Sequence, residues 1–337
     1  MPANTTILVG TVGEGVMRSA DDGHTWRRMG YPQGLHTDAL VRALVCDPGR
    51  PEVVFAGTDI GLYRSDDAGQ TWRSVESALS GYNVWALAVH PADPQTMYAG
   101  TGIPTPAGLF RSNDRGVTWE KRPMEAAEED RNFGVPRVTG IAIDPVNRGN
   151  IWVGLEVDGI RHSSDGGDTW VTTDGNGSIR PPDEHNVVPD VHNVAVAAGP
   201  PKTVFIVTND DVYMSTDDGM KWNALGISEV FPLSFARGIV AQPDSPNVIF
   251  VTIGDANPGR TGAVMRSKDT GLTWETLSLP VQPNSAIWMV NIQPNDPKVV
   301  FAASRYGYLY RSGDGGDSWT KLGREFSEIS SVIWIPG

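Results

Sequence analysis

Basic and aromatic side chains recur at one position of seven apolar segments in this 337-residue chain. Each segment, such as residues 84–90, is typical of a strand. When the segments are aligned on their shared ends, the equivalent position holds residues that simple packing would not select: Arg42, Trp85, Thr139, His192, Arg237, Trp288 and Ser331. Arginine pairs with carboxylate, phosphate or sulfate, and tryptophan offers an apolar face to a ring. The set predicts a pocket for an anionic ligand with a flat or sugar-like body. The other interpretation is a water-filled channel whose residues pair with one another or with Asp190.

More polar residues stand near this set. They precede the aligned positions (Asn83, Arg137, Asp190), lie in adjoining loops (His36, Asp38), or end the segments that follow (Glu156, Asp210, Arg305, Tyr306). Most of the residues at these segment ends are expected to be solvated turn residues, and Arg305-Tyr306 is the least turn-like pair. We predict that the ligand contacts Arg42, Trp85, Arg137, Arg237, Trp288, Asn83 and Arg305. If the pocket is catalytic, its acid, base or nucleophile is expected among His192, Asp190, His36 and Tyr306.

Histidines offer a weaker case for a metal. His36, His185 and His192 can approach one another, and three histidines can bind zinc. The sequence has no closely spaced histidine pair, no phosphate-binding loop, no dinucleotide fingerprint and no nucleophile elbow. We therefore predict neither a metal nor an organic cofactor.

An octapeptide repeat indicates how these residues are positioned. The pattern Ser-x-Asp-x-Gly-x-Thr-Trp occurs seven times, with Lys or Ser in place of Thr in two copies, and starts at Ser19, Ser65, Ser112, Ser163, Ser215, Ser267 and Ser312. Successive tryptophans are 45 to 52 residues apart, which suits one four-stranded propeller blade. Asp and Ser can bond turn amides, and Gly supplies a positive φ, so the repeats are predicted to be structural turns.

The first repeat leaves room for only three strands before it, and residues 329–335 form a strand with no blade after them. We therefore predict an all-β fold, in which residues 1–337 form a single seven-bladed β-propeller with four-stranded blades. The C-terminal strand would be the innermost strand of the first blade, and this closes the ring and removes exposed sheet edges.

The octapeptide resembles the Asp-box of BNR-repeat propellers, whose boxes lie on the face away from the binding site. Sialidases in this group use an arginine triad and a tyrosine nucleophile. That resemblance implies Arg42, Arg137 and Arg237 for the triad and Tyr306 for the nucleophile. However, sialidases have six blades and an Arg-Ile-Pro signature that this sequence lacks.

Two other relatives are nearer in blade count. Xyloglucan-hydrolysing enzymes resemble the chain blade by blade, but they use two facing propellers with a catalytic Asp from each. In this chain, Asp38 and Asp190 could act as acid and base across the channel. Photosystem II assembly factors resemble it in length and as single seven-bladed propellers, and they bind protein.

Composition limits the partners and the location. The net charge of −13 repels phosphate backbones, so nucleic acid is not an expected partner. The sequence shows no signal peptide and no membrane span, which favours a cytoplasmic protein. We predict a stand-alone Asp-box propeller that binds an anionic small molecule, a glycan or a protein at the central channel. The alternative is a glycoside hydrolase or lyase with an Arg/His/Trp-lined pocket.

Overall fold

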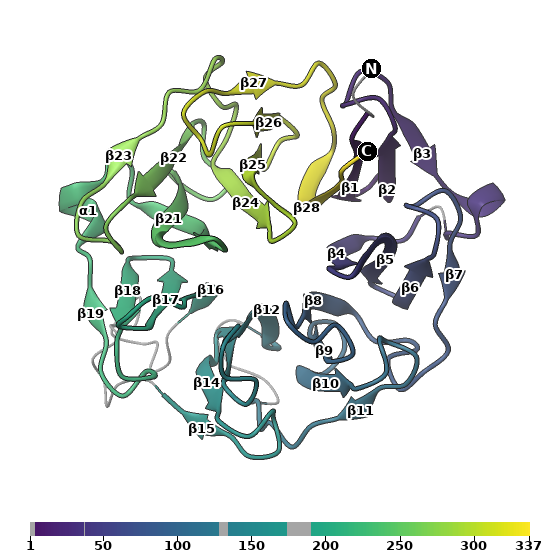
Figure 1. Cartoon of the computed structure of the whole chain (residues 1–337), viewed down its shortest axis with the longest axis horizontal. Helices are drawn as coiled ribbons and strands as arrows, with labels where there is room; N and C mark the ends of the chain where they lie inside the picture. The colour runs from purple at the N-terminus through teal and green to yellow at the C-terminus, as the bar shows by residue number, and fades with distance from the viewer. Residues whose placement is uncertain (1–3, 37, 128–133, 174–189) are drawn as a thin grey trace.

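Seven small sheets stand side by side around a central channel (Figure 1). The computed structural model describes residues 4–36, 38–127, 134–173 and 190–337. Each sheet has four antiparallel strands in the order expected for a propeller blade, so the prediction of an all-β, seven-bladed β-propeller is confirmed. Among the described residues, no helix is long and apolar enough to span a membrane.

The first four blades extend from the channel outward, beginning with the innermost strand. Blade one contains β28 (Glu328–Ile335), β1 (Thr6–Val12), β2 (Val16–Ser19) and β3 (Arg27–Met29). Blade two contains β4 (Val41–Asp47), β5 (Arg50–Thr58), β6 (Gly61–Ser65) and β7 (Arg73–Ser74). Blade three contains β8 (Val84–Val89), β9 (Met97–Thr101), β10 (Gly108–Ser112) and β11 (Glu120–Lys121). Blade four contains β12 (Arg137–Ile143), β13 (Ile151–Glu156), β14 (Gly159–Ser163) and β15 (Val171–Thr172).

The remaining three blades follow the same order. Blade five contains β16 (Val191–Ala197), β17 (Thr203–Thr208), β18 (Val212–Ser215) and β19 (Asn223–Ala224). Blade six contains β20 (Phe235–Gln242), β21 (Ser245–Gly254), β22 (Gly262–Ser267) and β23 (Glu275–Thr276). Blade seven contains β24 (Ile287–Gln293), β25 (Asp296–Ser304), β26 (Leu309–Ser312) and β27 (Thr320–Lys321). Short helical turns at Tyr31–Gln33 and α1 (Ile227–Val230) lie in the loops that leave blades one and five.

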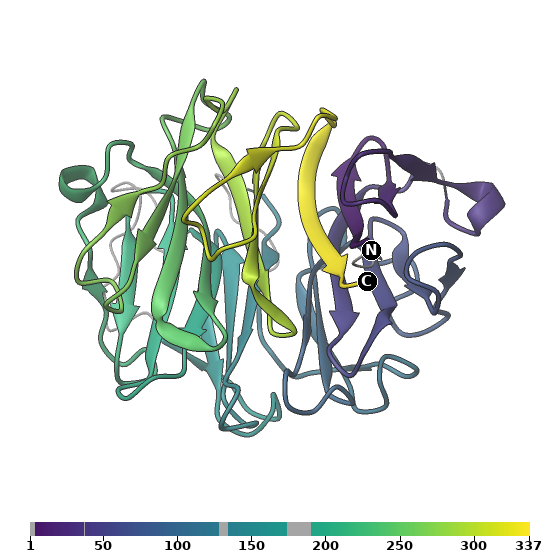
Figure 2. The same cartoon turned by 45° about the horizontal axis from the view of Figure 1, so that its top comes forward.

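The two ends of the chain meet in blade one. The C-terminal strand β28 pairs antiparallel with β1, with Thr6 opposite Ile335 and Val9 opposite Val332 (Figure 2). This confirms the prediction that the last strand completes the first blade as its innermost strand. The closure pairs both edges that an open ring would expose.

The octapeptide repeats form the same turn between the third and fourth strands of each blade. In the third copy, the Asp114 carboxylate accepts hydrogen bonds from the Ser112 hydroxyl, at 2.8 Å, and from the backbone and side chain of Thr118. The Trp119 indole N–H donates to the Gly116 carbonyl at 3.1 Å. The fifth copy departs from this pattern because its threonine is replaced by Lys221, which supplies no hydroxyl.

The repeat tryptophans fill the spaces between blades. Trp119 of blade three belongs to an apolar cluster with Phe55 and Leu62 of blade two. The second strands are the most buried elements, and every residue of β9 and β17 is buried. The innermost strand β12 instead alternates between buried and partly exposed residues, because one of its faces lines the channel. The core therefore lies between the blades and leaves the channel wall to polar residues.

Candidate functional site

Each innermost strand carries a register shift near its start, where one residue is skipped in the pairing with the second strand. The skipped residues are Arg42, Trp85, Thr139, His192, Arg237, Trp288 and Ser330. A β-bulge adds an unpaired residue and re-aims its side chain, and in this fold all seven line one cavity. The bulges explain why polar and aromatic residues recur at this position.

Six of these seven positions are the ones that the sequence alignment predicted, and the seventh is shifted by one residue. The bulge in β28 falls between Ser331, which pairs with Gly10, and Ile329, which pairs with Thr11. Ser330 therefore faces the cavity, while the Ser331 hydroxyl accepts a hydrogen bond from the Leu44 N–H at 3.0 Å. The prediction of Ser331 as a channel-lining residue is wrong.

The cavity has a volume of about 360 Å³, which lies within the usual range for small-ligand pockets. Besides the bulge residues it is lined by Val12, Arg137, Glu156, Asn193, Asn257, Met289, Arg305 and Glu328. Several of these residues lie where innermost strands begin and second strands end. The octapeptide turns join the other ends of the sheets, so the cavity lies at the opposite mouth of the channel. Its lining holds four arginines and two glutamates, although the whole chain is strongly acidic.

Two guanidinium groups lie over the Trp85 ring. The Cζ atom of Arg42 is 4.2 Å from the ring centroid, and that of Arg137 is 4.9 Å away. The indole N–H donates to the Ile103 carbonyl at 3.0 Å, and the same carbonyl accepts a hydrogen bond from Asn83 at 2.6 Å. Asn83 is buried and does not line the cavity, so it supports the Ile103 carbonyl that holds the indole instead of pointing toward a ligand.

Trp288 holds a second pair of arginines in the same way. The Cζ atoms of Arg237 and Arg305 lie 4.3 Å and 4.4 Å from its ring centroid. Cation–π contacts of this kind are worth about 0.5–2 kcal/mol each, depending on desolvation. Guanidinium groups therefore lie over both indoles, which also line the cavity.

Each pair contains one arginine with an acidic partner and one without. Arg137 forms a close ion pair with Glu156, and Arg305 lies 3.4 Å from Glu328. Within the described ranges, Arg42 and Arg237 have no hydrogen-bond or ion-pair partner, and the Nε atom of Arg42 is buried without one. Burial lowers the pKa of both unpaired guanidinium groups, and nearby carboxylates only partly offset this effect. Two partly desolvated cations thus face the cavity without a direct acidic partner among the described residues.

Glu156 is the most strongly perturbed acid of the cavity. Burial alone would raise the pKa of its carboxyl, but the Arg137 hydrogen bond and the charges of Arg237 and Arg137 outweigh burial and lower the pKa to about 2. Conversely, although burial opposes it, the Glu156 hydrogen bond and charge raise the pKa of Arg137. Glu156 is therefore ionised at any pH near neutrality and cannot serve there as a proton donor.

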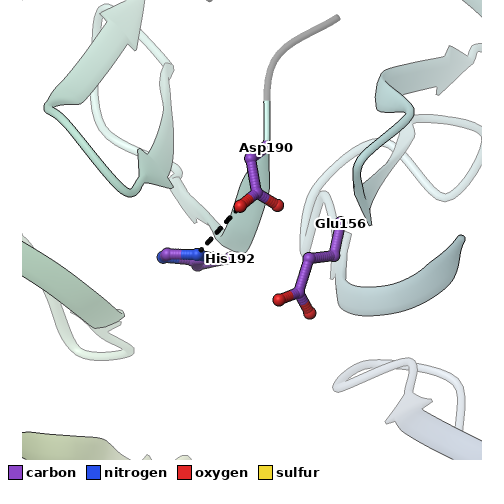
Figure 3. Close-up of side chains that lie close together, drawn as sticks. All are labelled: Glu156, Asp190 and His192. Carbon is purple, nitrogen blue, oxygen red and sulfur yellow. Dashed lines mark ion pairs between the residues drawn. The ribbon is translucent and has the colours of Figure 1, made fainter. Parts of the chain in front are cut away.

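His192, Asp190 and Glu156 converge at one side of the cavity (Figure 3). The His192 imidazole is buried, and its Nδ1 atom lies 3.1 Å from the Ala236 carbonyl. Its Nε2 atom lies 3.5 Å from Asp190 Oδ2. One donor atom from each of the three side chains falls within 4.8 Å of the other two. Sequence analysis singled out Asp190 and His192 but expected Glu156 to be a solvated turn residue, which is wrong.

Three other predicted residues lie away from this cavity. Tyr306 is 51% exposed and His36 is also exposed, with its ring 2.8 Å from the Tyr31 hydroxyl. Asp38 is exposed and lies 3.9 Å from Arg28. None of the three lines the cavity, and His185 lies outside the described residues. The structure therefore does not bring His36 and Tyr306 together with His192 and Asp190.

Comparison with known proteins supports a propeller of the BNR or sialidase-like type. A family model described as sortilin, neurotensin receptor 3, matches residues 210–334. A xyloglucanase of Hypocrea jecorina is 25% identical over 330 residues, an alignment that covers 84% of this chain. The same alignment covers only 38% of the fungal enzyme, so the chain spans well under half of that relative's length.

Two solved structures share the fold. The GH74 xyloglucanase from Xanthomonas campestris superposes with a TM-score of 0.62 at 22% identity, covering 83% of this chain and 45% of that one. A structure of YCF48 bound to D1 peptide superposes with a TM-score of 0.55 at 18% identity, covering 84% and 82% of the two chains. At these identities the likeness concerns the fold and does not extend to the site.

Proposed function

We propose that this propeller binds a small anionic ligand, such as an acidic sugar, in the cavity at the channel mouth. The observation that carries the proposal is the pair Arg42 and Arg237, two partly buried cations that line the cavity without ion-pair partners among the described residues. A carboxylate or sulfate would pair with guanidinium groups that the fold has already desolvated and held in place. Binding would thus offset the free energy that desolvation of these two guanidinium groups costs the unliganded protein.

The charge of the surroundings favours the same class of ligand. The lining contains two more arginines than glutamates, within a chain whose net charge is −13. A concave site of one sign on a surface of the other focuses the electrostatic potential, which selects small anions over large polyanions that would also meet the acidic exterior. The volume of about 360 Å³ suits a ligand of one or two sugar rings. A sugar is further supported by the sequence alignment with a xyloglucanase.

A hydrolase or lyase is the second candidate, favoured by the grouping of His192 with two carboxylates beside the arginines. In such an enzyme the arginines would neutralise the substrate's acid group. Since Glu156 stays ionised and its pKa is low, it would act through its charge and not as the acid or the base.

Calorimetric titration with acidic and neutral sugars tests the proposal. Uronates and sulfated sugars should bind, and uncharged sugars of the same size should not. Arg237→Ala should weaken binding by at least about tenfold, since a charge-assisted hydrogen bond is worth about 1.5–3 kcal/mol. Arg27→Ala, a change at an exposed position of the outer strand β3, is the matched control. Equal affinity of Arg237→Ala and the parent protein would overturn the proposal, and incubation of any bound sugar followed by NMR separates binding from turnover.

A further inference from the structure

The side chains of Glu156, Asp190 and His192 are each held through one atom, and each has a second donor atom that is not held in this way. We propose that these three residues bind a divalent metal ion at the channel mouth. Their nitrogen and two oxygen donors lie within 4.8 Å of one another, close enough to converge on one ion after small side-chain adjustments. The site is built from adjacent blades, because Glu156 ends β13 while Asp190 directly precedes β16 and His192 is its second residue.

The imidazole of His192 is oriented by the protein backbone. Its Nδ1 atom lies 3.1 Å from the Ala236 carbonyl, which can only accept a hydrogen bond, so Nδ1 carries the hydrogen. The neutral ring then presents the lone pair of Nε2, and the two carboxylates lie on the Nε2 side of the ring (Figure 3). A carbonyl that fixes the tautomer of a ligating histidine in this way is the usual outer partner in protein metal sites.

Each carboxylate is also anchored from behind. Asp190 Oδ1 accepts the Val157 N–H at 3.2 Å, which leaves Oδ2 to face His192. Glu156 is held by Arg137 through Oε2. The three donors therefore all have an outer-shell partner, and such partners are what orient metal ligands.

A cation resolves an electrostatic conflict in this arrangement. The His192 side chain is only 4% exposed, and its Nε2 atom lies 3.5 Å from Asp190 Oδ2, so these two acceptor atoms need a cation between them, either a proton on Nε2 or a metal ion. A metal ion would accept all three donors at once. One imidazole with two carboxylates and open positions suits Zn²⁺ or Mn²⁺ and matches metal sites that keep a position for a ligand.

The neighbouring arginines should make the affinity for the metal ion depend on whether an anion is bound. The charge of Arg237 already acts on Glu156, so a metal adds positive charge to a basic cavity. An anion bound at Arg42 and Arg237 offsets that charge. The metal and the anion should therefore strengthen each other's binding, and the coupling must be the same in both directions.

The test uses the full chain, stripped with a chelator and titrated with Zn²⁺ and Mn²⁺ alone by calorimetry, with Mn²⁺ also followed by electron paramagnetic resonance. One ion per chain should bind. Asp190→Asn keeps the shape and the Oδ1 acceptor, and it should weaken binding at least about tenfold, as should Glu156→Gln. His24→Gln, at an exposed histidine in an octapeptide turn, is the control for adventitious binding.

The outcomes separate this proposal from the anion proposal. Stoichiometric binding that Asp190→Asn and Glu156→Gln both lose, while thermal unfolding of the stripped variants matches the parent, supports the site. No binding, or binding that only His24→Gln reduces, overturns it and leaves a protonated His192 as the partner of Asp190. Anion titrations repeated in excess chelator report on Arg42 and Arg237 independently of the metal.

Discussion

Arg237 lies over the ring of Trp288, with its Cζ atom 4.3 Å from the ring centroid, and makes no hydrogen bond or ion pair within the described residues. The same ring supports Arg305, whose guanidinium group is 4.4 Å from the centroid. One indole thus holds two like charges close together. Burial is the main cause that lowers the pKa of Arg237; the charges of Glu156 and Asp190 oppose it, and those of Arg137 and Arg305 add smaller decreases. A bound anion would reduce the repulsion between these two guanidinium groups.

Replacing Trp288 by leucine should weaken anion binding by about tenfold, because Arg237 and Arg305 would lose their cation–π contacts and their fixed positions. Trp288→Phe retains an aromatic face and should lose less. Calorimetric titration with the same uronate or sulfated sugar measures both variants, after thermal unfolding has shown that they are folded. If the Trp288→Leu variant binds the sugar as tightly as the parent protein does, the ring does not position the arginines for a ligand.

Removing the acid that pairs with Arg305 should strengthen anion binding instead of weakening it. Glu328 lies 3.4 Å from Arg305 and lines the cavity, so Glu328→Gln adds one positive charge to the site. Anion affinity should rise by about threefold to tenfold, and more at low salt than at high salt. Glu325→Gln, which removes an exposed partner of Lys321, is the control. A fall in affinity would mean that Glu328 itself contacts the ligand.

The sequence predicted the fold and most of the cavity wall because both follow from repetition. Seven octapeptides fixed the blade period, and seven aligned strands fixed equivalent positions such as Arg42 and His192. The alignment failed at Ser331 because the bulge in β28 begins one residue earlier in the chain than the shared strand ends suggest. A bulge is a local pairing event, and no residue type in the segment marks it.

Tertiary partners could not be predicted in the same way. Glu156 looks like other acidic residues at strand ends, and only the approach of Arg137 and Arg237 makes it a buried, strongly acidic group. Trp85 and Trp288 were expected to offer a face to a ligand, but no residue pattern indicated that arginines would lie over both rings. Sequence position therefore located the wall of the cavity, while the pairing of charges across blades decides which side chains remain available to a ligand.

The octapeptide tryptophans should contribute to the stability of the fold and not to ligand binding. Trp119 is 7% exposed and packs with residues of the preceding blade, so Trp119→Ala should lower the free energy of unfolding by about 3–5 kcal/mol. Urea unfolding measures the loss. Lys121→Ala, in the exposed outer strand of the same blade, should change stability little. A Trp119→Ala protein with parental stability would contradict the structural role of the repeat.

The fifth octapeptide offers a gain of stability. In the third copy the Thr118 hydroxyl donates to Asp114, whereas Lys221 gives Asp217 only its backbone N–H. Lys221→Thr should restore the missing hydrogen bond and stabilise the fold by about 1 kcal/mol. Lys221→Val has the same branched shape without the hydroxyl and should lack this gain, so equal unfolding midpoints for the two variants would rule out the hydrogen bond as the cause.

Acid should weaken the octapeptide turns in a defined range of pH. Hydrogen bonds from the side chain and backbone of Thr25 lower the pKa of Asp21 to about 2, and those of Ser318 do the same for Asp314. A carboxyl whose pKa is lower in the folded chain stabilises the fold above its ordinary value near 4, and loses that contribution as the pH falls toward 2.

Urea unfolding between pH 6 and pH 2.5 should therefore show stability falling mainly below about pH 4, with the unfolded chain taking up protons. Asp314→Asn removes one titrating group and should be less stable at pH 6, but should lose less on acidification than the parent protein. Asp38→Asn removes a carboxyl that is exposed and lies outside the turns, so its acid profile should follow the parent. Parallel profiles for Asp314→Asn and the parent protein would show that the turn aspartates do not set the acid limit of the fold.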